Sequence, residues 1–439
     1  MLQRSEAMQS GVPRQPLDLL ETILPEEAWL LLWVRPRESR PGDRDLGAAA
    51  MRVRSWRRVL EIAHENGLAP LLASNLRGEA RDEVGLPAWF VQELDQRRYA
   101  CLARSAQVVF HLAPLLQELH EAGVPTMLLK GALLAETVYA DPGARSFSDV
   151  DLLVAPKDVP SAHQVLKRRG YASIRPVDLS RPPRTGRYLN SILYRGSRRE
   201  CSPIHLHWHL VNTSSAAGDY VFRIRMADLW AEAENLKLWD APVLAPEHHH
   251  LVVQLAEHAY REGFRKLSLL VDVAWASQAN SSGAFWQRTL QVARDWGLAT
   301  PCYSSLFLCS GLGLVGVPPH ALTRLHPVGR QSLAARILGR TLERPGVQSW
   351  GKLLYLANQP GLAGKVRFAL RALCPPVAEL EAIYGLAPGS VRALGYARWV
   401  AHRLWVAVRY VWAATGRLRG GLLCPLLSLL CEIAAACTL

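Results

Sequence analysis

The chain has 439 residues, of which 49% are hydrophobic and 20% are charged, and its formal net charge is +13. This composition excludes an intrinsically disordered chain, and the length allows two or three domains around a sizeable core. The positive charge favours anionic ligands such as nucleotides, nucleic acid or an anionic membrane surface. No long Arg/Lys tract alternates with aromatic residues, so we expect no dedicated nucleic-acid groove.

The first part of the chain is predicted to be mostly helical, from residue 16 to residue 122. Apolar residues recur there at helical spacing, in 28–34, 56–64 and 108–119. The charged segment 36–47, which contains Pro and Gly, is predicted to be a linker. We therefore expect a helical N-terminal region over 1–104.

The hydrophobic period then changes, which predicts a small α/β unit over 105–212. Short apolar runs bounded by turn residues are typical of strands. The predicted strands are 124–130, 148–154, 170–174, 191–194 and 203–210, with helices at 132–139 and 158–169.

Beyond residue 212 the pattern becomes helical again and predicts a helical C-terminal region over 213–416. Its predicted helices are 247–260, 266–276, 285–296, 305–312 and a stretch near 391–414. The expected fold class is thus α+β, with a small sheet inserted between two helical regions.

Residues 417–439 form an apolar segment that follows the basic stretch Arg417–Gly420. The segment is close to the length of a membrane span, but Pro425 and Glu432 interrupt it. We predict a packed or interfacial terminal helix that makes weak contact with a membrane surface, and a membrane span stays open as the alternative.

The predicted compartment is the cytoplasm. Residues 1–15 are polar and show no apolar core of a signal peptide. The eight cysteines are scattered and contain no Cys-x-x-Cys pair, so they are interpreted as reduced thiols rather than as a zinc site of that kind.

Two aspartates, Asp149 and Asp151, stand at positions i and i+2 of an otherwise apolar run. Alternate side chains of a strand share one face, so the two carboxylates are predicted to lie close together. Such a pair is costly unless a cation neutralises it, and a divalent metal in phosphoryl or nucleotidyl transfer is the usual remedy. In the alternative interpretation one Asp caps a turn and the other is solvated at a strand end.

The run Leu129-Lys130-Gly131, followed by Arg145 and by Asp149-Val-Asp151-Leu-Leu-Val, resembles the uncharacterised bacterial nucleotidyltransferase family of the polymerase-β superfamily. Further similarity lies in 64–72, 206–208, 250–272 and 374–386, so that the resemblance covers roughly 20–400.

The resemblance implies a nucleotidyltransferase core at 105–212 and transfer of a nucleoside monophosphate, from ATP or another NTP, to a hydroxyl or phosphate acceptor. It also implies Mg²⁺ or Mn²⁺ at Asp149 and Asp151, the catalytic carboxylates, with a third carboxylate from a neighbouring strand. The turn at Gly131 would admit the phosphates at a helix N-terminus, assisted by Lys130 and Arg145. Lys130 as a strand-end lysine and Arg145 as a surface arginine are the open alternatives.

The chain departs from this pattern at His205, where the family often carries an Asp before Leu-His-Trp. Either His205 is the third metal ligand, which favours manganese or zinc, or the ligand is lost. The second case predicts a catalytically impaired nucleotide-binding, scaffold or antitoxin-like protein. His205, His207 and His209 alternate along the strand and so share one face, as a metal site or as ordinary polar residues.

Two weaker groups of polar residues lie in the helical C-terminal region. Consecutive residues of a helix diverge, so 247–250, Glu-His-His-His, is predicted to be a solvated helix start and not a metal site. His258, Arg265 and Asp272 are predicted either to line the nucleotide pocket or to make contacts between helices.

Overall fold

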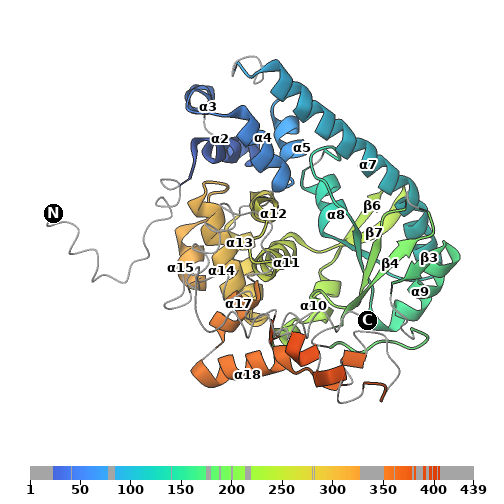
Figure 1. The fold of residues 1–439 in the computed structure, drawn as a ribbon. Coiled ribbons are helices and arrows are strands. Elements are labelled where there is room, and N and C mark those ends of the chain that lie inside the picture. The colour runs from blue at the N-terminus through green and yellow to red at the C-terminus, as the bar shows by residue number, and fades with distance from the viewer. Residues whose placement is uncertain are drawn as a thin grey trace.

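The computed structural model describes residues 23–405 with several gaps, which are 41, 78–84, 140, 175–178, 187–188, 199–200, 213–218, 279, 281, 327–350, 360, 378–379, 382–388, 392–394, 398 and 403. The predicted terminal helix at 417–439 lies outside these residues. Figure 1 shows helices at both ends of the described chain and one sheet between them.

One seven-stranded mixed sheet lies at the centre of the molecule. Its strands are β1 (Met127–Leu129), β2 (Val150–Leu153), β3 (Tyr171–Ser173), β4 (Ser191–Gly196), β5 (Ile204–His207), β6 (Glu234–Leu238) and β7 (Ala241–Ala245). They follow the spatial order β3-β4-β5-β2-β1-β7-β6. The pairs β2/β5 and β1/β7 are parallel and the other pairs are antiparallel.

The central strands β1 and β2 are buried over their whole length. This explains their continuous apolar runs, because a strand covered on both faces does not alternate between apolar and polar residues. Helix α7 (Ala88–Glu121) contacts β7, and Figure 1 shows it running along the sheet. Helix α8 (Lys130–Thr137) contacts β1 and β2, and α9 (Val159–Arg168) contacts β3 and α7.

The helices before the sheet bury an aromatic cluster. They are α2 (Pro25–Val34), η2 (Arg37–Ser39), α3 (Asp43–Ala50), α4 (Trp56–Glu65) and α5 (Ala69–Asn75). Trp29 packs against Trp56 with ring centroids 4.9 Å apart and against Phe90 of α7 at 6.1 Å. The first helices are thereby fixed to the helix that covers the sheet.

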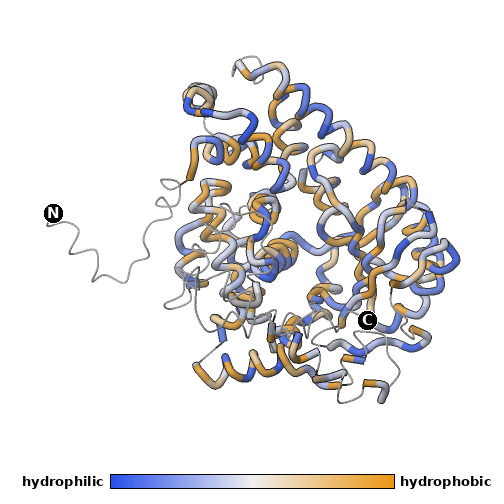
Figure 2. Tube along the Cα trace, in the orientation of Figure 1, coloured by the Kyte–Doolittle hydropathy of each residue, from blue (hydrophilic) through white to orange (hydrophobic). Residues whose placement is uncertain are grey.

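The helices after the sheet surround α11 (His248–Arg261), of which nearly every residue is buried. It contacts α12 (Leu267–Gln278), α13 (Gly283–Asp295), α14 (Ala299–Gly311) and α17 (Gly351–Asn358). Figure 2 shows apolar segments gathered in this bundle. The remaining elements are η3 (Pro156–Asp158), η4 (Asp219–Arg223), α10 (Met226–Ala231), α15 (Pro319–Leu325) and α18 (Gly361–Leu373).

The predicted fold class, α+β with a sheet between helical regions, is confirmed. The sheet is larger than predicted, because β6 and β7 come from the region 213–416 that was expected to be helical. Their connection has positive φ at both Trp239 (51°) and Asp240 (64°), as in a type I′ hairpin turn. Trp-Asp is not the usual Asn-Gly sequence of such a turn, so the hairpin left no strong signal.

Two further boundaries differ from the predictions. The single helix α7 crosses the proposed limit between 1–104 and 105–212, because its apolar face continues through that point. The predicted linker 36–47 contains η2 and the start of α3.

No helix in the described part of the chain is long and apolar enough to cross a membrane. The cysteines that the structure describes, Cys101, Cys201, Cys302, Cys309 and Cys374, are all free thiols.

Candidate functional site

The site is built where β1, β2 and β5 lie side by side. Leu129 is the register partner of Asp151 in β2, and Asp151 is in turn the partner of His205 in β5. The pairing therefore brings Lys130, Asp151 and His205 together.

The turn from β1 into α8 occurs at Lys130 and Gly131. Lys130 has φ of 48°, a left-handed conformation that is uncommon for a residue with a side chain. A Cβ added to Gly131 would lie 2.6 Å from Cβ of Phe147, so packing requires glycine there. Packing against Phe147 therefore explains why residue 131 is a glycine, independently of the predicted phosphate binding.

Asp151 is buried, and its Oδ1 is the meeting point of three side chains. Lys130 Nζ lies 3.3 Å away, His207 Nε2 lies 2.7 Å away and His205 Nδ1 lies 3.6 Å away. Burial alone would raise the pKa of Asp151, but the Lys130 charge and the two histidines hold it well below its usual value. Asp151 is therefore ionised at neutral pH.

His207 is the hydrogen-bond partner of Asp151, a contact that the sequence did not predict. A carboxylate only accepts, so His207 Nε2 donates to Asp151 and the ring is neutral when Nδ1 carries no proton. Burial lowers the pKa of His207 to about 3, which agrees with a neutral ring. Its Nδ1 is buried and has no hydrogen-bond partner among the described residues.

The three alternating histidines do not form one site. His205 and His207 lie together, with ring centroids 4.3 Å apart. His209 lies beyond the end of β5 and contacts Val211 instead. The alternation along the strand predicted that His207 shares the face of His205, but it did not exclude His209.

Asp149 lies just before β2 and accepts a hydrogen bond from the Ser148 hydroxyl at 3.0 Å. It is partly exposed, whereas Asp151 is buried. Both aspartates line one cavity of about 670 Å³, a volume typical of small-molecule sites. The two predicted carboxylates thus line the same cavity, but Asp149 is partly exposed to solvent and Asp151 is buried.

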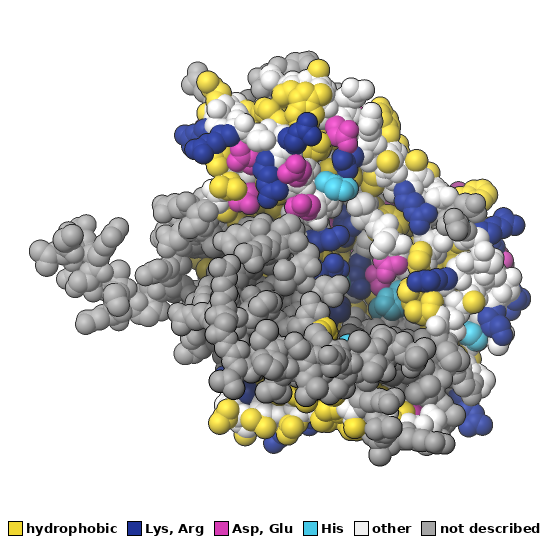
Figure 3. Space-filling view, viewed as in Figure 1, with side chains coloured by type: hydrophobic (Ala, Val, Ile, Leu, Met, Phe, Trp, Pro, Cys, Tyr) yellow, Lys and Arg dark blue, Asp and Glu magenta, His cyan; other side chains and the backbone are white. Residues whose placement is uncertain are grey.

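The walls of this cavity come from the sheet and from the helices α11 and α12. Its charged and histidine lining residues are Lys130, Arg145, Asp149, Asp151, His205, His207, His258, Arg261, Glu262, Arg265, Lys266 and Asp272. Figure 3 shows Lys/Arg, Asp/Glu and His side chains gathered near the middle of the described surface. A lining this polar suits a charged ligand.

Arg145 makes a different contact from those predicted for it. Its Nε and Nη2 each lie 2.8 Å from a carboxylate oxygen of Asp272 in α12, which also accepts a hydrogen bond from the Tyr139 hydroxyl. The charge of Asp272 outweighs burial and raises the pKa of Arg145. Arg145 therefore ties the segment before β2 to α12 and lines the cavity from that position.

The helical side of the cavity carries cations that the predictions mostly missed. Arg261 pairs with the buried Glu257 at 3.2 Å, and Arg265 pairs with Glu262 at 2.7 Å. Lys266 is exposed at the cavity, and no ion pair is found for it in the described part of the chain. His258, Arg265 and Asp272 all line this cavity, which was one of the two alternatives predicted for them. Asp272 also pairs with Arg145.

The predicted solvated helix start at 247–250 is wrong for two of its histidines. His249 and His250 are buried, with His250 fully inaccessible and stacked on Trp296 at 4.9 Å. The sequence pattern missed this because α11 packs against α13, and Trp296, just after α13, stacks on His250.

The residues of the cavity can hold a divalent cation. Asp151, His205 and His207 offer ligand atoms that lie within 4.8 Å of one another, and Asp149 lines the same cavity outside this group. Lys130 and His207 now contact the Oδ1 atom to which an ion would bind. If His205 and His207 both bind the ion, the two imidazoles favour Mn²⁺ or Zn²⁺, whereas a set of Asp149, Asp151 and His205 also admits Mg²⁺, which prefers oxygen ligands.

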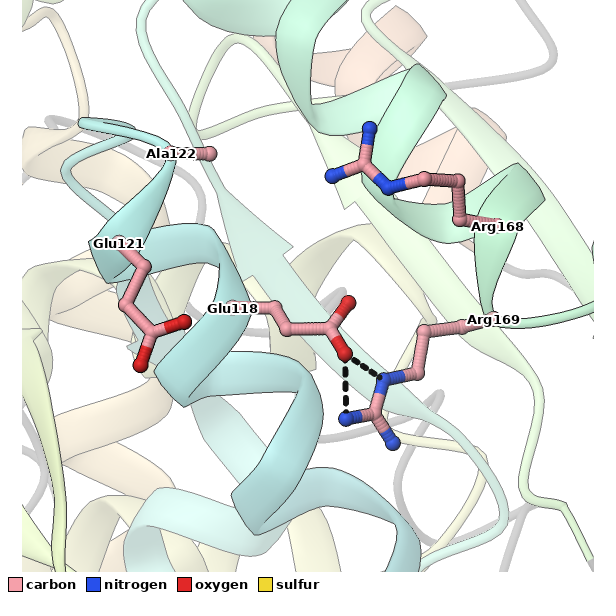
Figure 4. Close-up of a pocket in the computed structure, with 5 residues that line it drawn as sticks. All are labelled: Glu118, Glu121, Ala122, Arg168 and Arg169. Atoms are coloured by element: carbon pink, nitrogen blue, oxygen red, sulfur yellow. Dashed lines mark hydrogen bonds and ion pairs between the residues drawn. The ribbon is translucent and has the colours of Figure 1, made fainter.

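A second cavity of about 670 Å³ lies at the ends of α7 and α9. Figure 4 shows Glu118 and Glu121 on one side and Arg168 and Arg169 on the other. Glu118 and Arg169 pair at 2.6 Å, and both are partly exposed. An open ion pair of this kind supplies little binding energy, so we assign no function to this cavity.

The chain is similar to one known protein family. The model of a family described as uncharacterised nucleotidyltransferases matches residues 53–312, which is more than half of the chain. Among curated proteins none matches this sequence. A solved structure, an antigenic nucleotidyltransferase-like protein from Paracoccidioides brasiliensis, is 14% identical with a TM-score of 0.29. The match covers 50% of this chain and 97% of that one. On the family match, the chain belongs to the uncharacterised nucleotidyltransferase family.

Proposed function

We propose that this protein transfers a nucleoside monophosphate from an NTP to a hydroxyl or phosphate group of a small molecule, peptide or protein. The observation that carries the proposal is the buried, ionised Asp151 beside Lys130, in a cavity with five cationic lining residues. The other four cations are Arg145, Arg261, Arg265 and Lys266. Carboxylates opposite a cationic wall suit a triphosphate bound together with a metal.

The cations divide into two kinds. Arg145 and Arg261 are each neutralised by a buried acid, Asp272 and Glu257, so they mainly shape the wall. Arg265 and Lys266 are exposed and are better placed to attract the phosphates of an incoming nucleotide. Lys130 could contact the same phosphates if Asp151 bound a metal ion in place of the Lys130 ammonium group.

Asp149 and Asp151, with His205 as the third ligand, would hold a Mg²⁺ or Mn²⁺ ion. When bound, such an ion neutralises phosphate charge and lowers the pKa of an attacking hydroxyl. His207 is a positioning residue in this scheme, because its hydrogen bond orients the Asp151 carboxylate. The register of β2 and β5 keeps His205 opposite Asp151.

The proposed reaction is a displacement at the α-phosphorus. The acceptor oxygen forms a bond to that phosphorus, and the bridging bond between the α- and β-phosphates breaks. Pyrophosphate leaves with the bonding electrons, and a hydroxyl acceptor releases its proton to solvent. The chain contributes position and charge to this step.

The contacts of Asp151 favour a second candidate function, nucleotide binding without turnover. His205 stands where the resemblance implies a carboxylate, and Lys130 and His207 already neutralise Asp151. A protein of this kind would serve as a scaffold or as an antitoxin-like partner.

A pyrophosphate-release assay distinguishes the two functions. The full-length protein is incubated with each α-labelled NTP, Mg²⁺ or Mn²⁺, and a cell lysate as the source of acceptors. We expect label on an acceptor and pyrophosphate release, both lost in Asp149→Ala and Asp151→Asn. Asp240→Asn, at the exposed β6–β7 turn, is the matched control that keeps activity.

Three results would change the interpretation. Activity that persists in both site variants would reject the assignment of Asp149 and Asp151. Equilibrium binding of NTP without turnover under either metal would favour the non-catalytic function. Absence of both binding and turnover would reject the two candidates together.

A further inference from the structure

A second group of metal-ligating side chains lies outside the cavity, at the other end of α11. Glu232, His249 and His250 offer ligand atoms that lie within 4.8 Å of one another. Glu232 follows α10 and precedes β6, whereas the two histidines lie in the first turn of α11. Two separate segments thus converge on one point.

The orientation of His249 is that of a metal ligand held by a carboxylate. Its Nδ1 contacts the Glu247 carboxylate, and its Nε2 lies 3.0 Å from Oε2 of Glu232. A neutral imidazole has one N–H, so a proton on Nδ1 leaves a lone pair on Nε2 facing an acceptor. Nε2 has no aligned hydrogen-bond partner among the described residues, and a cation between the two atoms would satisfy both. Metal-binding histidines commonly have such an outer carboxylate.

The environment of His250 is the stronger evidence for a bound ligand. His250 is fully buried, and neither ring nitrogen has a hydrogen-bond partner in the described part of the chain. Its ring stacks parallel on Trp296, at 4.9 Å and 5°, which fixes its plane. Buried polar atoms are nearly always satisfied, so this imidazole needs a ligand that accepts its lone pair.

The charges around the group are compatible with a cation. Glu232 contacts Arg288 of α13 through Oε1, which leaves Oε2 on the side of His249. The Glu232 carboxylate thus keeps one oxygen for a cation while Arg288 holds the other.

We propose that Glu232, His249 and His250 form a Zn²⁺ site with three protein ligands and a fourth position open to solvent beside Glu232. Two imidazoles and one carboxylate are a zinc-type donor set. Tetrahedral zinc at normal bond lengths places its ligand atoms about 3.3 Å apart. His249 Nε2 and Glu232 Oε2 are 3.0 Å apart, and all three ligand atoms lie within 4.8 Å of one another, so small movements suffice. Glu232 is the partly exposed member and can adjust to the ion.

The site fixes the start of α11 to the segment that leads into β6. His258, which lines the candidate active-site cavity, lies eight residues beyond His250 on the same helix. That separation corresponds to about 12 Å of helix, so the zinc site and the cavity are distinct. The expected role of zinc is to hold the helix that supplies His258 and Arg261.

Zinc affinity of the metal-stripped full-length protein, measured by competition with a chromophoric chelator, tests the proposal. We expect Glu247→Gln to weaken zinc binding by about 10–100-fold, as for other outer carboxylates, and Glu232→Gln and His249→Gln to weaken it at least as much. The neighbouring residues Glu234 and His248 provide matched controls, and Glu234→Gln and His248→Gln should retain wild-type affinity. The melting temperature should rise with zinc only in proteins that bind it.

Asp151→Asn separates this site from the Asp151–His205–His207 group. The proposal requires that Asp151→Asn still bind one zinc ion per protein molecule and that Glu232→Gln fail to bind this ion. Loss in Asp151→Asn with retention in Glu232→Gln would place zinc in the other cavity and overturn the proposal, as would absence of zinc binding by the wild type. If His249→Gln fails to fold, as judged by circular dichroism, Glu232→Gln decides alone because its side chain is partly exposed.

Discussion

At the scale of single residues, the candidate site depends on the contacts that two neighbouring side chains make with Asp151. Lys130 supplies a charge and His207 supplies a hydrogen bond, and both contact the same carboxylate oxygen. The arrangement keeps Asp151 ionised while it is buried. Burial, more than the nearby Lys130 charge, lowers the pKa of His207 and keeps its ring neutral.

The depressed pKa of His207 predicts part of the acid sensitivity of the protein. In the unfolded chain this histidine gains a proton near pH 6.5, whereas in the folded protein its pKa is about 3. Between these values the unfolded state binds more protons, so the free energy of unfolding falls as the pH is lowered. The slope from one such group approaches about 1.4 kcal/mol per pH unit.

We expect His207→Gln to flatten this dependence, as measured by urea unfolding at several pH values from 7 to 4. His248→Gln is the control, because its ring is about one-third exposed. Equal slopes for His207→Gln and the wild type would show that the ring is protonated in the folded state.

Gly131 permits a second prediction at the residue scale. Gly131→Ala brings a methyl group against Cβ of Phe147 and should destabilise the protein by about 1–3 kcal/mol, as overpacking does. Adding Phe147→Gly removes the Cβ that the new methyl group would meet, so the double variant should lose less than the sum of the two single losses. Additive losses in urea unfolding would indicate that phosphate access, rather than packing, requires the glycine.

At the scale of elements, Arg145 connects the loop before β2 to α12. Its two hydrogen bonds to Asp272 and the Tyr139 hydroxyl form one largely buried group. The loop that carries Asp149 is therefore positioned by a helix more than 100 residues later in the chain.

Removing one member of this pair should be costly. Arg145→Met leaves the Asp272 carboxylate buried without its partner and should lower the free energy of unfolding by about 3–5 kcal/mol. Arg145→Met combined with Asp272→Leu removes both charges and should recover most of the loss. A double variant as unstable as the sum of the singles would mean that the pair is not a coupled unit.

At the scale of the whole molecule, the candidate cavity lies between the sheet and the helices that follow it. Binding of NTP with Mn²⁺ should therefore stabilise both parts together. We expect a single melting transition that rises with nucleotide concentration, measured by differential scanning calorimetry. Asp151→Asn should reduce the rise and Asp240→Asn should preserve it. Two transitions, of which one is insensitive to nucleotide, would contradict a shared site.

The sequence by itself determined the strand–turn–helix at 127–137 and the Asp-bearing strand β2. Their signals are local, since alternation, a Gly turn and a continuous apolar run arise within a few residues. The resemblance also singled out His205 in the β5 segment, and the pairing of β5 with β2 is what sets it opposite Asp151.

Only the tertiary structure decided which side chains complete the sites. His207, Arg261 and Lys266 reach the cavity because β5, α11 and α12 pack around it, and Arg145 turns to Asp272 because α12 approaches its loop. His249 and His250 are buried, although the helix start is polar in the sequence, because α11 packs against α13 and Trp296 stacks on His250. Such contacts depend on residues far apart in the chain, so no local pattern encodes them.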